Sequence, residues 1–317
     1  MTPPSGAPGR VQLVVACANR KTQPVPGSLR LRHVVDASSA GRAAQWIDQL
    51  ERSTEPTLPA RQLYAGEHWQ VVRGLEPTAA AAGLDASLWV CSAGYGLVSA
   101  DAPLRPYAAT FATGHADSVS ADPRNRPRWW ASLADWKGPV PSAPRTLRDL
   151  ARSQPRTVFL VALSSTYLAA CADDLLGLAD ELASPEHLTI ISTGTRSSGP
   201  LARHLAPATA QLQPMLGGTR QSLNARILAY LLREQAAALT HTYIQRVLGG
   251  LLAAAPPLAR YERAPRTDHQ VRMFIRRRLT SEPEVTASRL LREFREFGYA
   301  CEQGRFAALY RAVCEDR

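Results

Sequence analysis

Lysine is almost missing from this chain of 317 residues, because only Lys21 and Lys137 are present and arginine supplies the rest of the 37 basic side chains. With 27 acidic residues the net charge is +10 and the isoelectric point is about 9.8. Arginine binds phosphate oxygens through a planar fork of donors. A GC-rich coding sequence would explain arginine in place of lysine, but not the excess of basic over acidic residues. That excess favours nucleic acid as the partner.

Long apolar runs and clustered cysteines are also missing. No stretch approaches the ~18 consecutive apolar residues of a membrane span, and the opening MTPPSGAPGR lacks the apolar core of a signal peptide. The five cysteines are scattered, so their spacing predicts neither a metal site nor a disulfide framework. We therefore expect no membrane partner, no metal, no other cofactor and a reducing, cytoplasmic environment.

Apolar strand-like runs alternate with helical periodicity over most of the chain. Predicted strands lie at 11–18, 88–91, 156–163 and 188–192, and predicted helices at 40–52, 69–82, 123–137, 146–153, 164–182 and 242–255, with a break expected at Pro77. This alternation is typical of an α/β fold, and we expect a mixed sheet flanked by helices over residues 1–258. The pair Pro256-Pro257 is predicted to end this domain.

The stretch 88–119 is the most distinctive part of the chain. An apolar strand ends in SAGYGL, where Gly94 and Gly96 remove side-chain bulk around Tyr95. A long polar loop follows and carries Asp101, Tyr107 and Asp117. Gly94, Tyr95 and Tyr107 are expected to contact substrate, with Tyr95 stacking on a base. Loops at strand ends concentrate binding and catalytic groups, so this loop is a candidate active site, although glycine-rich turns with one tyrosine are also common structural features.

Three short motifs in the first 120 residues carry a resemblance to a known family. They are ACANRK at 16–21, LYAGEHW at 63–69, and SAGYGL at 92–97 followed by Pro106-Tyr107. As an ordered set they resemble the YaaA-like superfamily, named for the peroxide-stress protein, and a related domain of unknown function. The glycine-rich run near 217 fits more weakly, and the last sixty residues lie outside the resemblance. It implies association with DNA, with 7-deazaguanine chemistry in DNA or with a DNA glycosylase fold.

Further strand ends and helix starts carry polar groups suited to an anion. Such turns can hold phosphate through backbone N–H groups, although they are also ordinary connections. The candidates for contacting substrate are Asn19, Arg20 and Lys21 after the first strand, Thr193, Gly194 and Thr195 after the strand at 188–192, and Asn224 and Arg226 after Gly217-Gly218.

Residues 265–317 differ in character, because they are strongly charged and helical in pattern throughout. Helices predicted at 268–279, 286–297 and 302–313, with Gly298 in a turn, have the spacing of a helix-turn-helix DNA-binding module. The expected DNA contacts are Arg272, Arg276, Arg277 and Arg278 of the first helix and Gln303, Arg305 and Arg311 of the last. A small helical bundle that mediates dimerisation is the alternative.

Together these features predict an enzyme that acts on a modified nucleobase in DNA, most simply a DNA glycosylase in DNA repair or in defence against phage. A glycosylase needs a carboxylate and a closed pocket, and the expected catalytic residues are Asp117, Asp101 and Asn19. One alternative is a DNA-binding accessory protein without turnover. The other is a deazapurine-modifying enzyme with Cys17 as nucleophile, although the apolar context of Cys17 argues against this role.

Overall fold

The computed structural model describes residues 9–35, 39–194, 199–234, 239–257 and 262–316. The chain divides into two compact units, Met1–Pro256 and Pro257–Arg317, at the expected proline pair. Each unit is described by itself.

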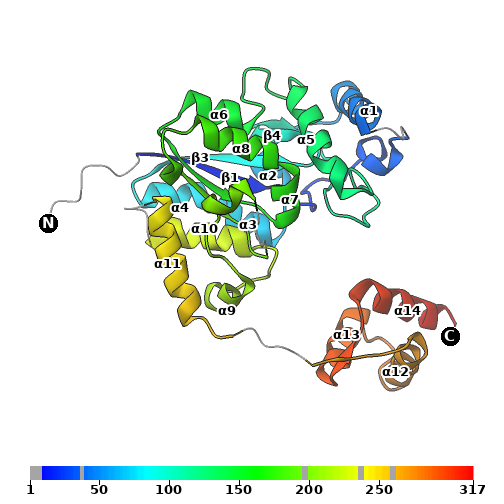
Figure 1. Ribbon diagram of the computed structural model, residues 1–317. Coiled ribbons are helices and arrows are strands. Elements are labelled where there is room, and N and C mark those ends of the chain that lie inside the picture. The colour runs from blue at the N-terminus through cyan, green and yellow to red at the C-terminus, as the bar shows by residue number, and fades with distance from the viewer. Residues whose placement is uncertain (1–8, 36–38, 195–198, 235–238, 258–261, 317) are drawn as a thin grey trace. The chain divides into compact units, whose positions relative to one another are not determined.

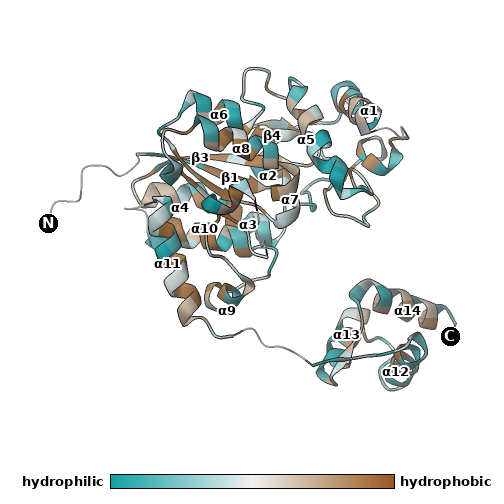
Figure 2. Ribbon diagram, viewed as in Figure 1, coloured by the Kyte–Doolittle hydropathy of each residue, from teal (hydrophilic) through white to brown (hydrophobic). Residues whose placement is uncertain are grey.

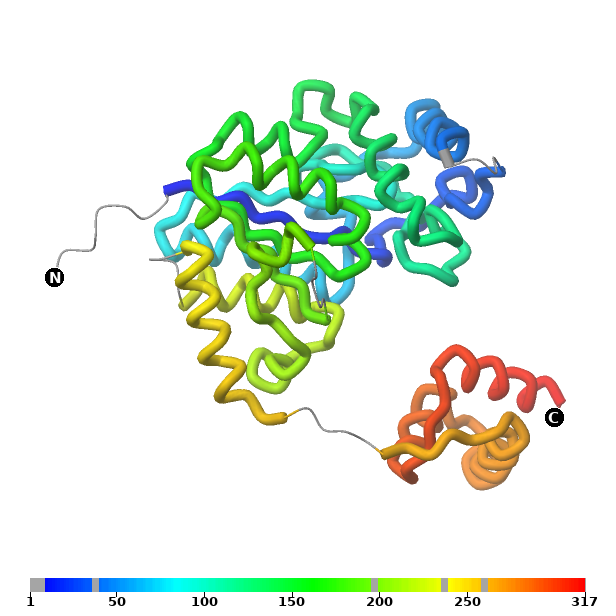
Figure 3. The backbone as a smooth tube through the Cα atoms, viewed as in Figure 1, coloured from blue at the N-terminus to red at the C-terminus, as the bar shows by residue number. Residues whose placement is uncertain are grey.

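A five-stranded mixed sheet forms the centre of the first unit. Its strands are β1 (Arg10–Ala16), β3 (Asp85–Ser92), β4 (Gly96–Ser99), β6 (Val158–Ala162) and β7 (Leu188–Ile191), in the order β4-β3-β1-β6-β7. β1 runs parallel to β3 and β6, and β6 runs parallel to β7, whereas β4 returns antiparallel to β3. The colours of Figure 3 show β1, early in the chain, lying between the later β3 and β6. The predicted α/β class is therefore confirmed.

Helices cover both faces of this sheet, as Figure 1 shows. α1 (Ser39–Arg52), α5 (Arg126–Asp135), α6 (Leu147–Ser153) and α8 (Ala172–Glu181) lie on one face, and α3 (Glu67–Arg73), α4 (Leu75–Ala81) and α10 (Leu223–Glu234) on the other. The strands are hydrophobic along their length (Figure 2), and all five residues of β6 are buried. Strands that are buried on both faces need such continuous apolar runs.

The remaining elements of the first unit are short, apart from one longer helix. α11 (His241–Ala254) packs against the β7 edge of the sheet. β2 (Leu58–Pro59) pairs with β5 (Pro103–Leu104), and the short helices are α2 (Ala60–Leu63), α7 (Ser165–Ala170) and α9 (Gln213–Leu216), together with several 3-10 turns.

Among the differences from the predicted elements, three have a clear local cause. The break expected at Pro77 falls instead at Gly74, because Pro77 occupies the first turn of α4, where its missing N–H has no helical partner to lose. The helix predicted over 164–182 is divided at Cys171 into α7 and α8. β4 was missed, because its four residues continue a glycine-rich turn that reads as loop.

The second unit holds three helices around its own small core. They are α12 (Asp268–Ser281), α13 (Ala287–Glu296) and α14 (Gln303–Glu315), and a two-residue strand β8 (Ala264–Pro265) pairs with β9 (Tyr299–Ala300). Val271, Ile275 and Leu279, which recur at helical spacing on α12, pack with Phe294 and Phe306, and Phe274 is partly buried against them. The connection from α13 to α14 includes β9 and is longer than the tight turn of a simple helix-turn-helix.

None of the helices in the described part of the chain has the length and apolar character needed to cross a membrane.

Candidate functional site

A cavity of about 500 Å³ opens at the carboxyl ends of β1 and β6. This is the edge of a parallel sheet where ligands usually bind, and the volume lies in the range of small-molecule sites. Its walls come from the loop after β1, the start of α3, the start of α7 and the start of α10. The polar lining side chains are Cys17, Asn19, Arg20, Glu67, His68, Thr110, Ser164, Tyr167, Thr219, Gln221 and Asn224.

Two of the sequence motifs meet at this cavity through backbone pairing. Lys21 forms an antiparallel bridge with Tyr64, and Ala65 N donates to Arg20 O at 2.9 Å. The turn after β1 is thereby fixed against the segment that leads into α3. Asn19 and Arg20 are exposed at the cavity, as expected of substrate-binding residues.

Glu67 is the first residue of α3 and the carboxylate of this cavity. Its Oε1 accepts hydrogen bonds from Thr219 N at 2.9 Å, Ser222 Oγ at 2.9 Å and an Arg226 guanidinium nitrogen at 3.1 Å. The Thr219 backbone N–H, followed by the side chains around it, lowers the pKa of Glu67 to about 2. The carboxylate is therefore ionised and held in one orientation, and Oε2 is the oxygen left to face a ligand.

His68 follows Glu67 and contributes a neutral imidazole ring. Its Nε2 lies 3.0 Å from Ala16 O, and because a carbonyl can only accept, the proton is on Nε2. Burial lowers the pKa of His68, so the ring is neutral and Nδ1 carries a lone pair. Within the described residues this buried Nδ1 has no partner. His68 lines the cavity, but Nδ1 itself is covered by neighbouring atoms.

Cys17 reaches the same cavity from the end of β1. It is half-buried, and its Sγ lies 3.1 Å from the Tyr167 hydroxyl. Burial raises the pKa of Tyr167 well above its usual value, so this hydroxyl stays protonated. Cys91, Cys171 and Cys301 are buried and do not line the cavity, which makes Cys17 the thiol best placed for chemistry.

Lys21 does not line the cavity. Its Nζ donates to Ala18 O at 2.7 Å and to Asn19 O at 3.1 Å, and lies 4.3 Å from the centre of the Tyr107 ring. Burial lowers the pKa of Lys21 to about 8, with Cys17 acting in the opposite direction. The expected substrate contact is thus replaced by a role in closing the turn after β1.

Gly94, Tyr95 and Tyr107 were expected to contact substrate, but they lie beneath the cavity in the core. Both tyrosines are buried, and the Tyr107 hydroxyl lies 2.9 Å from Tyr64 Oη and 2.7 Å from Ser92 Oγ. A Cβ on Gly94 would come 2.5 Å from Cδ2 of the Tyr107 ring. The glycine is therefore needed for close packing, and Tyr95 is not exposed for stacking on a base.

The two predicted catalytic aspartates are paired with arginines outside the cavity. Asp117 is buried, and its Oδ1 accepts from Arg32 Nε at 2.8 Å and from Arg32 N at 3.1 Å. Burial alone would raise the pKa of Asp117, but the bonds from Arg32 outweigh it and lower the pKa. Asp101 is exposed and binds Arg61 through both oxygens, at 2.6 and 2.8 Å. Neither lines the cavity, so we do not retain them as catalytic candidates.

Asn224 lines the cavity, but its side-chain hydrogen bonds are made within the fold. Its Oδ1 accepts from Thr193 N at 2.9 Å and Thr193 Oγ1 at 2.8 Å, and its Nδ2 donates to Leu163 O at 2.8 Å. The amide thus ties α10 to the ends of β6 and β7. Arg226 contacts Glu67, Gly194 is exposed with φ +87°, and Thr195 lies outside the described residues.

Glu67, His68 and Tyr167 were not among the predicted site residues. A usable signal existed for the first two, because two ionisable side chains follow Gly66 at the start of a helix inside the LYAGEHW motif. Ser164 and Tyr167 follow β6 in a capped helix start, which was read only as a cap.

The predicted DNA-binding arginines of the second unit divide into paired and unpaired groups. Arg278 binds Glu293 at 2.8 Å, and Arg305 Nε binds Asp268 at 2.7 Å, so these two brace the helices. Arg276 is 3.6 Å from Asp316. The others are exposed and make no ion pair within the described residues: Arg272, Arg277 and Arg311. Gln303 lines a cleft between α13 and α14.

Comparison with protein-family models, with curated proteins and with solved structures finds no match to this chain. The YaaA-like resemblance therefore stays a prediction. In the part of the chain that the structure describes, no three His, Cys, Asp or Glu side chains come together as metal ligands.

Proposed function

We propose that this protein is a DNA-acting enzyme that takes a nucleobase into the cavity at the ends of β1 and β6 and cleaves its N-glycosidic bond. The observation that carries the proposal is an ionised carboxylate, Glu67, held by three hydrogen bonds in a cavity of suitable size that His68 also lines. The excess of arginine and the resemblance to the YaaA-like superfamily support DNA as the substrate.

The chemistry follows from the roles that these side chains can fill. As the bond from C1′ to the base nitrogen breaks, positive charge develops on the sugar, and a fixed carboxylate stabilises it without reorganisation. Water then adds to C1′, and the base leaves with a proton on its nitrogen. The neutral His68 ring forms part of the wall against the base, while Asn19 and Arg20 contact the flanking sugar or phosphate.

The decisive experiment incubates the full-length protein with duplex DNA that carries diverse modified bases and then applies alkali, which breaks strands at abasic sites. Glu67→Gln keeps the size of the side chain and removes its charge, so we expect excision to fall about 100-fold or more. Asp85→Asn is the matched control, because Asp85 is exposed at the amino end of β3, opposite the cavity, and should leave excision unchanged.

A second mechanism is favoured by the position of Cys17 beside Tyr167: the Cys17 sulfur would displace the base from C1′, and water would then displace the sulfur, which leaves an abasic site and restores the thiol. The same assay separates the two mechanisms. Excision that survives Glu67→Gln but is lost in Cys17→Ser would assign the reaction to the thiol. Absence of abasic sites with every modified base would refute base excision.

A further inference from the structure

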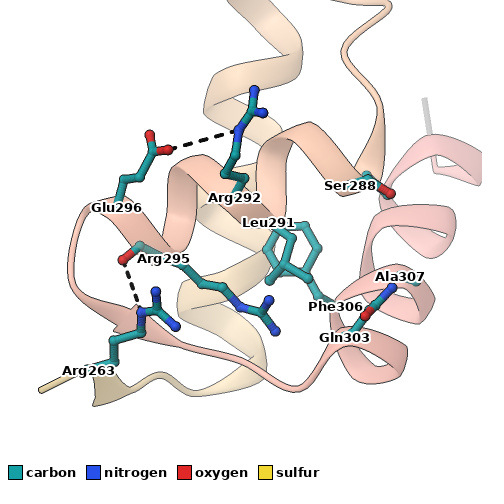
Figure 4. Close-up of a pocket in the computed structure, with 10 residues that line it drawn as sticks. Arg263, Ser288, Leu291, Arg292, Arg295, Glu296, Gln303, Phe306 and Ala307 are labelled. Carbon is teal, nitrogen blue, oxygen red and sulfur yellow. Dashed lines mark hydrogen bonds and ion pairs between the residues drawn. The ribbon is translucent and has the colours of Figure 1, made fainter. Parts of the chain in front are cut away.

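A second cleft, of about 680 Å³, lies in the unit Pro257–Arg317 between α13 and the first turns of α14. Figure 4 shows its lining, with Arg295 extending from α13 toward α14. The buried side chains of Leu291 and Phe306 form an apolar floor, and the small side chains of Ala287 and Ala307 line its sides. The polar lining residues are Arg263, Ser288, Arg292, Arg295, Glu296 and Gln303.

The positive charge of this cleft is only weakly compensated. Arg292 lies 3.9 Å from Glu296, and both side chains are about 70% exposed, so the pair contributes little. Arg295 donates to Cys301 O at 3.2 Å, and a neutral carbonyl leaves its charge uncancelled. By contrast, Arg278 and Arg289 each bind a carboxylate at less than 3 Å.

The start of α13 adds a polar group to the cleft. Ser288 is the second residue of α13 and lines the cleft, so its hydroxyl is available there. Guanidinium groups and a hydroxyl can donate hydrogen bonds to the oxygens of a phosphate group. The apolar floor between small side chains can pack against a sugar ring.

We propose that this cleft binds the phosphodiester backbone of DNA, with phosphate on Arg292 and Arg295 and sugar against Leu291 and Phe306. This rests on the proposed function in naming DNA as the partner. In this proposal the main DNA contact of the unit is made by α13, for which the sequence predicted no DNA contact, instead of by the arginines of α12.

The test measures binding of the full-length protein to labelled duplex DNA over a series of salt concentrations. We compare Arg292→Gln/Arg295→Gln with Arg272→Gln/Arg277→Gln, which removes the same charge from exposed positions of α12 outside the cleft. The cleft variant should lose about tenfold or more in affinity, and its logarithmic salt slope should fall by about two. The α12 variant should change the affinity and the salt slope much less.

A third variant guards against loss of folding. Ser288→Glu places a carboxylate in the first turn of α13, where negative charge stabilises a helix. It should keep or raise the melting temperature and still weaken DNA binding, because it repels phosphate. Thermal denaturation of all three variants accompanies the binding assays.

Equal losses in the two double variants would mean that net charge alone matters and would overturn the cleft assignment. Unchanged DNA affinity in the cleft variant, with lost binding of poly-glutamate, would assign the cleft to an acidic peptide instead. Failure of the wild type to bind DNA would overturn both proposals. Intact binding without base excision would overturn only the proposed function.

Discussion

Gly94→Ala provides a quantitative test of how the cavity is supported. A Cβ at this position would meet Cδ2 of Tyr107 at 2.5 Å, far inside the contact distance of two carbons. The ring cannot move away easily, because it is fully buried, packs edge-on against Tyr95 at 5.1 Å, and is bonded through its hydroxyl to Tyr64 and Ser92. The substitution must therefore shift packed backbone or break buried hydrogen bonds.

Overpacking of a core costs about 1–3 kcal/mol, and each lost buried hydrogen bond adds about 1 kcal/mol. We therefore expect Gly94→Ala to lower the free energy of unfolding by roughly 2–4 kcal/mol. Gly250→Ala is the matched control. Gly250 is exposed inside α11 with open space around it, so alanine should stabilise the protein by about 0.5–1 kcal/mol.

Urea denaturation followed by tryptophan fluorescence is a suitable assay, because Trp46 and Trp129 donate to Gly94 O and Ala93 O, both at 2.8 Å. A double-mutant cycle with Tyr107→Leu identifies the cause, since a smaller side chain should reduce the cost of the added methyl group. Wild-type stability for Gly94→Ala, or a cost that does not depend on residue 107, would refute the packing argument.

Two further predictions concern charge. Asp117→Asn should lower the melting temperature, because the buried Asp117 carboxylate binds Arg32, and should leave base excision near the wild-type rate. Normal stability together with lost excision would instead show that Asp117 is catalytic. Burial lowers the pKa values of His204 and His241 below 6.5, so the unfolded state gains protons first on acidification. Stability should therefore fall below that pH by up to about 1.4 kcal/mol per pH unit for each histidine, and a stability curve unchanged by His204→Gln/His241→Gln would contradict this.

Much of the fold could be predicted from the sequence, because strands that are buried on both faces of a parallel sheet consist of continuous apolar residues. The run at 156–163 contains the fully buried strand β6, whereas the helical spacing of Val271, Ile275 and Leu279 reflects burial of one face of α12 in the second unit. β4 could not be predicted in this way, since its four residues pair only with β3 and carry no periodic pattern of their own.

The site was predicted less well, because the state of a polar side chain depends on partners that are distant in sequence. Asp101 and Arg61 are 40 residues apart, and Asp117 and Arg32 are 85 apart. The loop sequence alone presents both aspartates as available carboxylates. Only the folded chain shows that each is already bound, and that Glu67 instead faces the cavity.

The resemblance motifs have a shared physical role that explains this outcome. Ser92, Tyr64 and Tyr107 form one buried hydroxyl network, and Lys21 lies over the Tyr107 ring while closing the turn that carries Asn19 and Arg20. Distinctive residues such as these hold the ends of β1 and β3 and the start of α3 in a fixed relation. The groups able to touch a ligand lie inside the same motifs, next to these structural residues, as Glu67 and His68 do after Gly66. Changes at Tyr64, Ser92 and Tyr107 should consequently act through stability, and changes at Glu67 and His68 through binding and turnover.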